Sequence, residues 1–509
     1  MASLIIHGHF YQPPRENPWT GIVEAQPSAA PFHDWNERIY SECYQPNAFA
    51  RISDPETGTD LVVNNYGNVS FNVGPTLMSW LEQNHPDTYA RIIDADREGA
   101  LKHGGHGNAI AQAFGHAILP LCNERDRQTQ IRWGVADFRF RFGREPEALW
   151  LPETACNDAV MGALIDEGLR FVILAPHQAA RVRVFGNTEW RDVDEQSLDT
   201  SVSYRYSHRD GSGRSIAVFF YDGPASRAIA FEGLLKSSRE LVDRFVTAKR
   251  AGHLVNVATD GETYGHHFKF GEICLAHALE MEAPGRGFAI TNYGEYLDHH
   301  SPLLEVEINS GPDGEGTSWS CPHGVARWIR DCGCLTGGEA GWSQAWRTPL
   351  RQALNFLRDE NIECFESTRG ESFIDPWQAR NDSSALILDP HHSREQFLYD
   401  HAGRWLSREE QGRALAFLEM QRMVLLMYTS CGWFFHDISG IETIQILKYA
   451  CRAIDLMEQL GLPPVRDRLL EILAEAKSNN PELGNGADIY RRLIEPLKPR
   501  PDSDKVLVT

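Results

Sequence analysis

Two short stretches of the chain place acidic residues directly after an apolar run. In TDGETYGHH (259–267), the apolar run 254–258 leads into four polar side chains, Asp260, Glu262, His266 and His267. In WLPE, Glu153 follows Pro152, which halts another apolar run. The first stretch can form a catalytic carboxylate with its helpers, a metal site or a polar loop.

Glu153 and Asp260 are the candidate catalytic pair. A carboxylate held rigidly at a strand end, and partly desolvated by Trp150 and Leu151, suits a nucleophile. A carboxylate near another anion has a raised pKa and can donate a proton. Glycoside hydrolysis needs both functions, because one group attacks the anomeric carbon while the other protonates the leaving oxygen. The alternative is that each acid caps a helix or belongs to a turn.

The first apolar run, 4–6, leads into HGHFYQPP. His7 and His9 share one face of a strand because strand side chains alternate with a period of two. They can hydrogen-bond sugar hydroxyls, orient a carboxylate or bind a metal. A metal site needs further ligands at neighbouring strand ends, which His266 or His267 would supply. We expect sugar contacts, and a metal-dependent hydrolase is the alternative.

A glycine-rich stretch, KHGGHGNAIAQAFGHAILPL (102–121), precedes a helical pattern. It is not a phosphate loop, because no Gly-Lys-Ser/Thr follows. Its glycines allow the backbone to approach a ligand closely, with His106 and His116 reaching in. The alternative is a helix start whose histidines face solvent.

Two stretches of the second half carry further chemistry. SCPHGVARWIRDCGC (320–334) contains four possible zinc ligands, Cys321, His323, Cys332 and Cys334. Their C-x-C spacing and long gap differ from the usual paired C-x₂-C ligands, so we expect buried thiols, with metal binding as the alternative. In MYTSCGWFFHDISG (427–440), Trp433 either offers a sugar-stacking surface or packs in a core.

The elements that position these residues alternate between strands and helices over the first 300 residues. Short apolar runs lie at 4–6, 69–73, 148–152, 171–175 and 254–258. Such strands, separated by helical patterns, indicate a parallel sheet covered on both faces. In a parallel barrel the active site lies at the carboxyl ends of the strands, where these polar residues stand.

The pattern changes twice along the chain. Residues 200–223 predict two strands joined by a turn at 210–213, a hairpin inserted in the α/β pattern. Beyond residue 300, a crossing rich in Gly, Pro and Ser leads into helical patterns over 346–358, 411–428, 442–460 and 465–477. We predict a barrel over 1–300, a helical domain over 301–494 that completes the cleft, and a tail over 495–509.

The charge balance excludes two classes of partner. Lys and Arg number 49 against 70 Asp and Glu, a net charge of −21. Such a surface repels phosphates, so nucleic acid and anionic membranes are poor partners, whereas a neutral substrate is indifferent to it. No apolar stretch is long enough to span a membrane and the N-terminus lacks a basic signal region. We therefore expect a cytoplasmic protein whose ten cysteines are reduced.

In this order, four of these stretches resemble the motifs of glycoside hydrolase family 57, the retaining α-glucan-active enzymes. The matching stretches are IHGHFYQPP, GGHGNAIAQAFGHAILPL, WLPE and TDGETYGHH, which cover roughly residues 4–300. The resemblance implies an α/β fold, an incomplete (β/α)7 barrel followed by a mostly helical C-terminal domain. It also implies Glu153 as nucleophile and Asp260 as acid/base. His116 looks like a feature of branching enzymes, and TSCGWFF looks like a less characterised subgroup.

The resulting hypothesis is an enzyme acting on α-1,4-glucan or maltooligosaccharides with retention, of the amylase, 4-α-glucanotransferase or branching type. Its predicted substrate-binding residues are His7, His9, His106, His116, Trp150, Glu262, His266, Trp319 and Trp433. No metal or other cofactor is expected to be needed. A non-catalytic glucan-binding protein is the second alternative.

Overall fold

The computed structural model of the chain describes residues 2–53, 58, 60–250 and 254–499. These residues belong to two compact units. The first unit comprises Met1–Gln12, Ala25–Ala113 and Asp137–Trp319, and the second comprises Pro13–Glu24, Phe114–Ala136 and Ser320–Thr509. The domain limits predicted from the sequence stay predictions, and most of the predicted tail, residues 500–509, lies outside the described residues.

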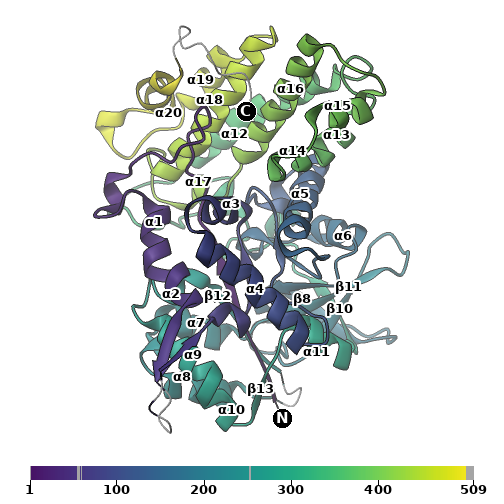
Figure 1. Cartoon of the computed structure of the whole chain (residues 1–509), viewed down its shortest axis with the longest axis vertical. Coiled ribbons are helices and arrows are strands. Elements are labelled where there is room, and N and C mark those ends of the chain that lie inside the picture. The colour runs from purple at the N-terminus through teal and green to yellow at the C-terminus, as the bar shows by residue number, and fades with distance from the viewer. Residues whose placement is uncertain (1, 54–57, 59, 251–253, 500–509) are drawn as a thin grey trace. The chain divides into compact units, whose positions relative to one another are not determined.

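Seven parallel strands of the described chain form a barrel in the first unit, and two of them, β11 and β12, are labelled in Figure 1. They are β1 (Ala2–Phe10), β4 (Ser70–Val73), β5 (Ala111–Gln112), β6 (Leu149–Trp150), β7 (Phe171–Leu174), β11 (Ser215–Phe220) and β12 (Leu254–Asp260). Their spatial order is β12-β1-β4-β5-β6-β7-β11, with single bridges joining β4 to β5 and β6 to β7. Most residues of these strands are apolar, and the strands are almost wholly buried because both of their faces are covered.

The ring of strands is closed by contacts just beyond β11 rather than by a ladder. The main-chain N–H of Asp222 donates to the carbonyl of Asn256 in β12 over 2.8 Å, and the Asn256 side chain donates to the carbonyl of Phe220 over 3.2 Å. No strand ladder joins β11 to β12 among the described residues. The barrel is therefore incomplete at this seam.

The predicted hairpin has a double role. Strand β10 (Ser203–Ser207) pairs with β11 in antiparallel register, from Ser203 opposite Phe219 to Ser207 opposite Ser215. However, β11 also pairs in parallel with β7, so the second strand of the hairpin is a barrel strand and not an insertion. The sequence pattern missed this because antiparallel pairing on one edge of β11 leaves its other edge free for a parallel neighbour.

The remaining strands of the first unit extend or flank the barrel. They are β2 (Ala50–Ser53), β3 (Asp60–Val63), β8 (Ala179–Val184), β9 (Arg191–Asp192), β13 (Phe288–Ile290) and β14 (Leu304–Ile308). Strand β13 pairs in parallel with the first residues of β1, and β14 lies between β10 and β8.

Helices follow most barrel strands. They are α1 (Trp35–Ile39), α2 (Gln45–Ala48), α3 (Pro75–Asn84), α4 (Pro86–Lys102), α6 (Asp158–Asp166), α7 (Gly223–Phe231), α8 (Ser238–Ala248), α9 (Gly271–His277), α10 (Ala283–Gly285) and α11 (Tyr293–His299). Side-chain caps start several of them: Asn157 accepts from Val160 N–H at α6, and Asp222 accepts from Ala225 N–H at α7. A core cluster of Ile5, Trp150 and Phe219 links β1, β6 and β11.

The second unit is mostly helical. Helix α5 (Glu124–Phe142) begins in it, and the later helices are α12 (Arg347–Glu366), α13 (Pro376–Asp382), α14 (Ser384–Leu388), α15 (Arg394–Ala402), α16 (Arg408–Leu426), α17 (Cys431–Phe434), α18 (Ile441–Gln459), α19 (Arg466–Leu473) and α20 (Gly486–Ile489). Helix α16 packs on α18, and α12 packs on α19.

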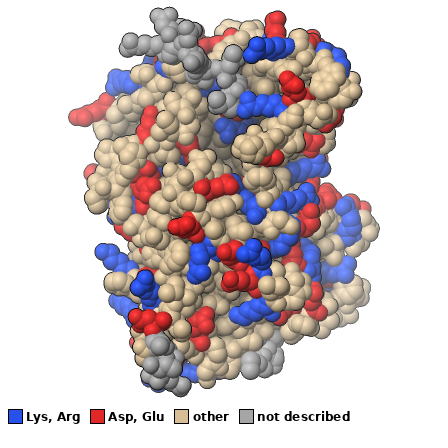
Figure 2. All heavy atoms as spheres, in the orientation of Figure 1, with Lys and Arg blue, Asp and Glu red and all other residues tan. Residues whose placement is uncertain are grey.

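The surface is charged but mixed in sign. Acidic and basic side chains are interspersed over the face seen in Figure 2. Within the described part of the chain, every helix is too short or too polar to cross a membrane.

Candidate active site

Glu153 stands on a strained turn at the carboxyl end of β6. Leu151 and Pro152 lead the chain from β6 into a short 3-10 turn, where Glu153 has φ 59° and ψ 21° and Thr154 has φ 48°. A non-glycine residue in this left-handed region costs on the order of 1–3 kcal/mol and typically marks a functional site. Gln178 supports the turn, because its Nε2 donates to the Thr154 carbonyl over 2.8 Å.

Trp319 holds the Glu153 carboxylate. The indole Nε1 donates to Glu153 Oε2 over 3.1 Å, and the Trp319 main-chain N–H donates to the Glu153 carbonyl over 3.0 Å. The ring packs edge-on against Trp150 and His9, with centroids 5.2 and 6.3 Å away. Trp319 remains partly exposed, so it fixes the carboxylate and still offers surface to a ligand.

Asp260 ends strand β12. Its side chain is open to water on one side, and protein atoms surround the carboxyl group on its other sides. Burial raises the pKa of Asp260 well above its ordinary value, and the negative charges of Glu262 and Glu153 raise it further. Asp260 is thus a carboxyl group that tends to keep its proton, beside a strained and oriented Glu153.

Glu262 lies behind Asp260. It is 7% exposed and accepts hydrogen bonds from Tyr44 Oη over 2.6 Å and from the Tyr11 main-chain N–H over 2.9 Å. Burial raises the pKa of Glu262 to about 7, and these two hydrogen bonds oppose the rise. The predicted sugar contact of Glu262 does not match this placement, because its Oε1 accepts from two protein groups and little of the side chain is open.

Inside the barrel, Trp150 is stacked between two histidines. Its ring centroid lies 4.7 Å from that of His7 and 5.0 Å from that of His9, both nearly parallel. His7 is 0% exposed, with Nδ1 3.1 Å from Ser70 Oγ and Nε2 3.1 Å from Asn72 Oδ1. Burial lowers the pKa of His7 to about 3, so the ring is neutral.

This burial leaves three predicted sugar contacts with little open surface, and their contact with a sugar stays a prediction. Trp150 is 1% exposed and His9 is 4% exposed, so neither has a free ring face. His7, His9 and Trp150 instead form a packed polar core inside the barrel, to which Asn72 adds a donor over 2.9 Å to His9 Nδ1. Alternation places the two histidines on one face, but that face points into packed side chains.

His106 lies at the opposite end of the barrel. It precedes β5, and its ring stands between two carboxylates, with Nδ1 3.0 Å from Glu147 and Nε2 3.0 Å from Asp298. Glu147 precedes β6 and also binds Arg170, which precedes β7. The prediction that His106 contacts substrate does not match this position. Glu153 and Asp260 lie at the carboxyl ends of their strands, whereas His106 lies before the amino end of β5.

His116 and Trp433 belong to the core of the second unit. His116 is 2% exposed, has φ 53°, and lies with Nδ1 2.7 Å from Ser430 Oγ. Trp433 is 0% exposed, and the Arg351 guanidinium lies 4.3 Å from its ring centroid. Both predicted sugar contacts are corrected by this burial, and the core alternative for Trp433 describes it.

His266 stays a candidate. It is partly exposed, its Nδ1 binds the Glu42 carboxylate, and Trp35 packs edge-on against its ring at 6.2 Å. His267 next to it is exposed.

Sequence reasoning missed Tyr44 and Gln178. Tyr44 donates a hydrogen bond to Glu262, and Gln178 supports the Glu153 turn. Neither lies in a motif, and no sequence signal marks them.

The histidines do not form the site that the metal-dependent alternative requires. Within the described ranges, three or more His, Cys, Asp or Glu ligand atoms converge only at Cys321, His323, Cys332 and Cys334, in the second unit. His7 uses both ring nitrogens for Ser70 and Asn72.

Comparison with known families gives two matches. A family model described as "Glycosyl hydrolase family 57" matches residues 14–308, more than half of the chain. A second model, described as "Domain of unknown function (DUF3536)", matches residues 342–505. The first match includes Glu153 and Asp260 and confirms the resemblance that the four sequence motifs indicate.

Individual relatives are distant. An alpha-amylase of Pyrococcus abyssi is 22% identical over 316 residues, which are 61% of this chain and 43% of that protein. The chain spans less than half the length of the curated relatives it matches.

Two solved structures share the fold. An exo-type maltose-forming amylase from Pyrococcus sp. ST04 has a TM-score of 0.68 at 16% identity, covering 93% of this chain and 82% of that one. A branching enzyme of the same family from Pyrococcus horikoshii has a TM-score of 0.52 at 14% identity, covering 98% and 96%. At these identities the likeness concerns the fold alone, and it confirms the predicted incomplete barrel followed by a helical domain.

Proposed function

Because the chain belongs to glycosyl hydrolase family 57, we propose that it acts on an α-glucan by a double displacement at Glu153 and Asp260. The observation that carries the proposal is the contrast between the two carboxyl groups. Glu153 is oriented by Trp319, whereas burial and two neighbouring anions favour a proton on Asp260. A nucleophile and a proton donor are the two groups that such a reaction requires.

The chemistry runs in two steps. Glu153 attacks the anomeric carbon, and Asp260 gives its proton to the departing glycosidic oxygen, which leaves a covalent glycosyl-enzyme. Asp260, now ionised, then takes a proton from the acceptor as that acceptor attacks the anomeric carbon and releases Glu153. Water as acceptor gives hydrolysis, and a sugar hydroxyl gives transfer or branching.

Retention of configuration is part of the proposal. It needs the two carboxyl groups to lie about 5–5.5 Å apart, without room for an attacking water between them.

The proposed substrate is an α-1,4-glucan or a maltooligosaccharide. The amylase and the branching enzyme that share the fold are named for α-glucan chemistry, which supports this class. The exposed part of the Trp319 ring is the proposed contact for the sugar beside the scissile bond, with His266 as a second contact. A neutral polysaccharide also suits a protein of net charge −21.

Product analysis tests the proposal. Amylose and maltooligosaccharides are incubated with the full chain, and the first products are followed by chromatography and by NMR of the anomeric proton. Products that first appear as the α-anomer support retention, and the length of the products separates hydrolysis from transfer and branching. A first product in the β-form contradicts retention.

Two further results separate the alternatives. Glucan binding without any product, under conditions where a family member is active, would favour a non-catalytic glucan-binding protein. Activity that disappears on chelation and returns with added metal, while Glu153→Gln and Asp260→Asn keep full turnover, would favour a metal-dependent hydrolase.

We further propose a cytoplasmic location. All ten cysteines are free thiols in the structure, which suits a reducing compartment. Cell fractionation with an antibody against the chain tests this, and recovery in an osmotic-shock fraction would contradict it.

A further inference from the structure

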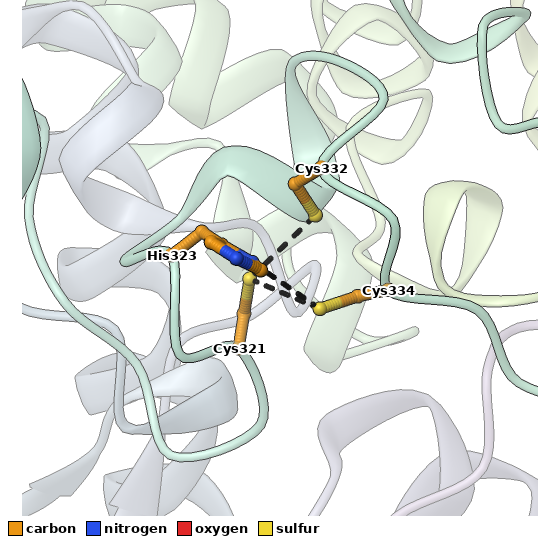
Figure 3. Close-up of side chains that lie close together, drawn as sticks. All are labelled: Cys321, His323, Cys332 and Cys334. Atoms are coloured by element: carbon orange, nitrogen blue, oxygen red, sulfur yellow. Dashed lines mark hydrogen bonds between the residues drawn. The ribbon is translucent and has the colours of Figure 1, made fainter.

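The segment from Ser320 to Trp346 opens the last part of the second unit with little regular structure. Its one helical turn is Ala326–Trp328. Loops of this length inside compact units are uncommon, and they need something other than secondary structure to order them. Four side chains of the segment, Cys321, His323, Cys332 and Cys334, meet at one point (Figure 3).

The distances between these side chains match a tetrahedral metal site. Cys321 Sγ lies 3.8 Å from Cys332 Sγ and 3.9 Å from Cys334 Sγ, and Cys334 Sγ lies 3.5 Å from His323 Nδ1. Zinc bonds of about 2.3 Å to sulfur and about 2.0–2.1 Å to nitrogen give tetrahedral edges of about 3.8 Å between sulfurs and about 3.5 Å between sulfur and nitrogen. All four ligand atoms lie within 4.8 Å of one another.

Two turns supply the ligands in pairs. Cys321 and His323 come from one turn, and Cys332 and Cys334 come from a second turn that faces it (Figure 3). The pairs are C-x-H and C-x-C, which explains why spacing alone favoured buried thiols over a metal. The three sulfurs also stand far beyond the S–S bond length of about 2.05 Å, so they are not cross-linked.

The charges around the cluster call for a negative group. Arg347 is 0% exposed, and its Nη1 donates to the Cys334 carbonyl over 2.8 Å. Arg327 is 6% exposed, and its positive charge lies close enough to repel that of Arg347. Asp331 attracts Arg347 through space, but among the described residues neither arginine forms a salt bridge, and the Nε of each is buried without a partner.

Buried, incompletely compensated cations are costly. Three thiolates and a neutral imidazole around a divalent ion carry a net charge of −1, which offsets one of the two positive charges of the arginines. Neutral thiols at the same positions would offset nothing. Charge and geometry therefore point to the same occupant.

We propose that Cys321, His323, Cys332 and Cys334 bind one structural Zn²⁺. Four protein ligands close the coordination shell, so the ion orders the segment and takes no part in the proposed glucan chemistry. Soft thiolates with one imidazole favour zinc over magnesium or calcium. Binding displaces one proton from each of the three thiols as the three Zn–S bonds form. The proposal replaces the sequence-based expectation of no metal, and it does not depend on the proposed function.

Metal content of the full chain tests the proposal. Protein from zinc-supplemented cells is desalted and analysed by mass spectrometry of the elements, together with Cys332→Ser, Cys334→Ser and His323→Ala. The matched control is Cys364→Ser, a half-buried cysteine of α12 outside the cluster. We expect one zinc per chain in the wild type and the control, and a large loss in the cysteine variants.

The unfolding temperature measures the effect of the metal on stability, separately from metal content. A strong chelator should lower the unfolding temperature of the wild type and of Cys364→Ser, but not that of Cys334→Ser. If the cysteine variants fail to fold, cobalt reconstitution of the wild type still decides, because tetrahedral cobalt thiolates absorb visible light strongly.

Three outcomes would overturn the proposal. The first is wild-type protein without stoichiometric zinc after supplementation, together with no cobalt spectrum. The second is zinc that stays bound in Cys332→Ser and Cys334→Ser. The third is an intact mass lower by two hydrogens, with a Cys321–Cys332 disulfide found in freshly lysed cells.

Discussion

At the amino end of the barrel, Glu147 and Asp298 lie beside Arg170 and His106, whereas at the carboxyl end Asp260 and Glu262 lie beside each other. Arg170 and His106 hold the pKa of Asp298 below its ordinary value. Asp260 and Glu262 form no salt bridge among the described residues, and burial with mutual repulsion raises the pKa of Asp260.

Carboxyl groups have different uses at the two ends of the barrel. Carboxylates that are paired with cations stay ionised and help to hold the strand ends together. A carboxyl group that is partly desolvated and surrounded by anions has a raised pKa, which suits proton transfer but costs stability. The two ends of one barrel thus differ in function because the charges around their carboxylates differ, although the strands are built alike.

The largest expected effect is the loss of the nucleophile. Glu153→Gln should lower kcat on amylose by on the order of 10⁴-fold or more, because no covalent intermediate can form. Glu147→Gln is the matched control at the other end of the barrel, and its turnover should stay near wild type. Turnover is measured by the release of reducing ends, and circular dichroism checks that both variants fold. Equal rates for the two variants would contradict the contrast between the two ends of the barrel.

Loss of the proton donor should have the next largest effect on turnover. Asp260→Asn should lower turnover of maltooligosaccharides by roughly 10²–10⁴-fold, the range of general acid–base catalysis. Formation of the glycosyl-enzyme from an aryl glycoside should suffer much less, since a good leaving group needs no proton. The measurement is the burst of phenol against steady turnover, and an equal loss on both substrates would argue against an acid role for Asp260.

A smaller effect concerns the anion behind Asp260. Glu262→Gln keeps an acceptor for Tyr44 and Tyr11 but removes a negative charge that raises the pKa of Asp260. The pKa of Asp260 should fall, so the protonated form is lost at lower pH and the alkaline limb of kcat/KM moves to lower pH. A limb that stays in place or moves to higher pH would show that Glu262 does not tune Asp260.

The smallest effect should come from the amino end. Asp298→Asn removes partners of Arg170 and His106, and because Asp298 is half exposed the loss of unfolding free energy should be at most about 1 kcal/mol. A lowered pKa in the folded state stabilises above the unfolded pKa of about 3.9, and that contribution is lost as pH falls through the folded value.

Urea unfolding near neutral pH and in acid checks this last prediction. The difference between wild type and Asp298→Asn should be present near neutral pH and should shrink in acid. Glucan turnover should be unchanged, and a loss comparable to that of Asp260→Asn would break the distinction between the two ends.

The sequence was informative where a local rule applies. Apolar runs bounded by polar residues located β1, β4, β6, β7 and β12, since a strand buried on both faces carries mostly apolar side chains. It was less informative for β5, which has two residues and is defined by its neighbours. For β11, pairing on one side concealed the parallel partner on the other.

Residue type and spacing by themselves picked out Glu153 and Asp260 as the carboxylates at strand ends, along with the family motifs around them and the four ligand types of the cysteine cluster. Only the tertiary structure decided what surrounds each side chain. It buried His7, Trp150 and Trp433, placed His106 at the amino end, and brought two ligand pairs of unusual spacing to one point. The physical reason is that alternation and spacing fix which side chains share a face, whereas burial, pKa and metal geometry depend on segments distant along the chain.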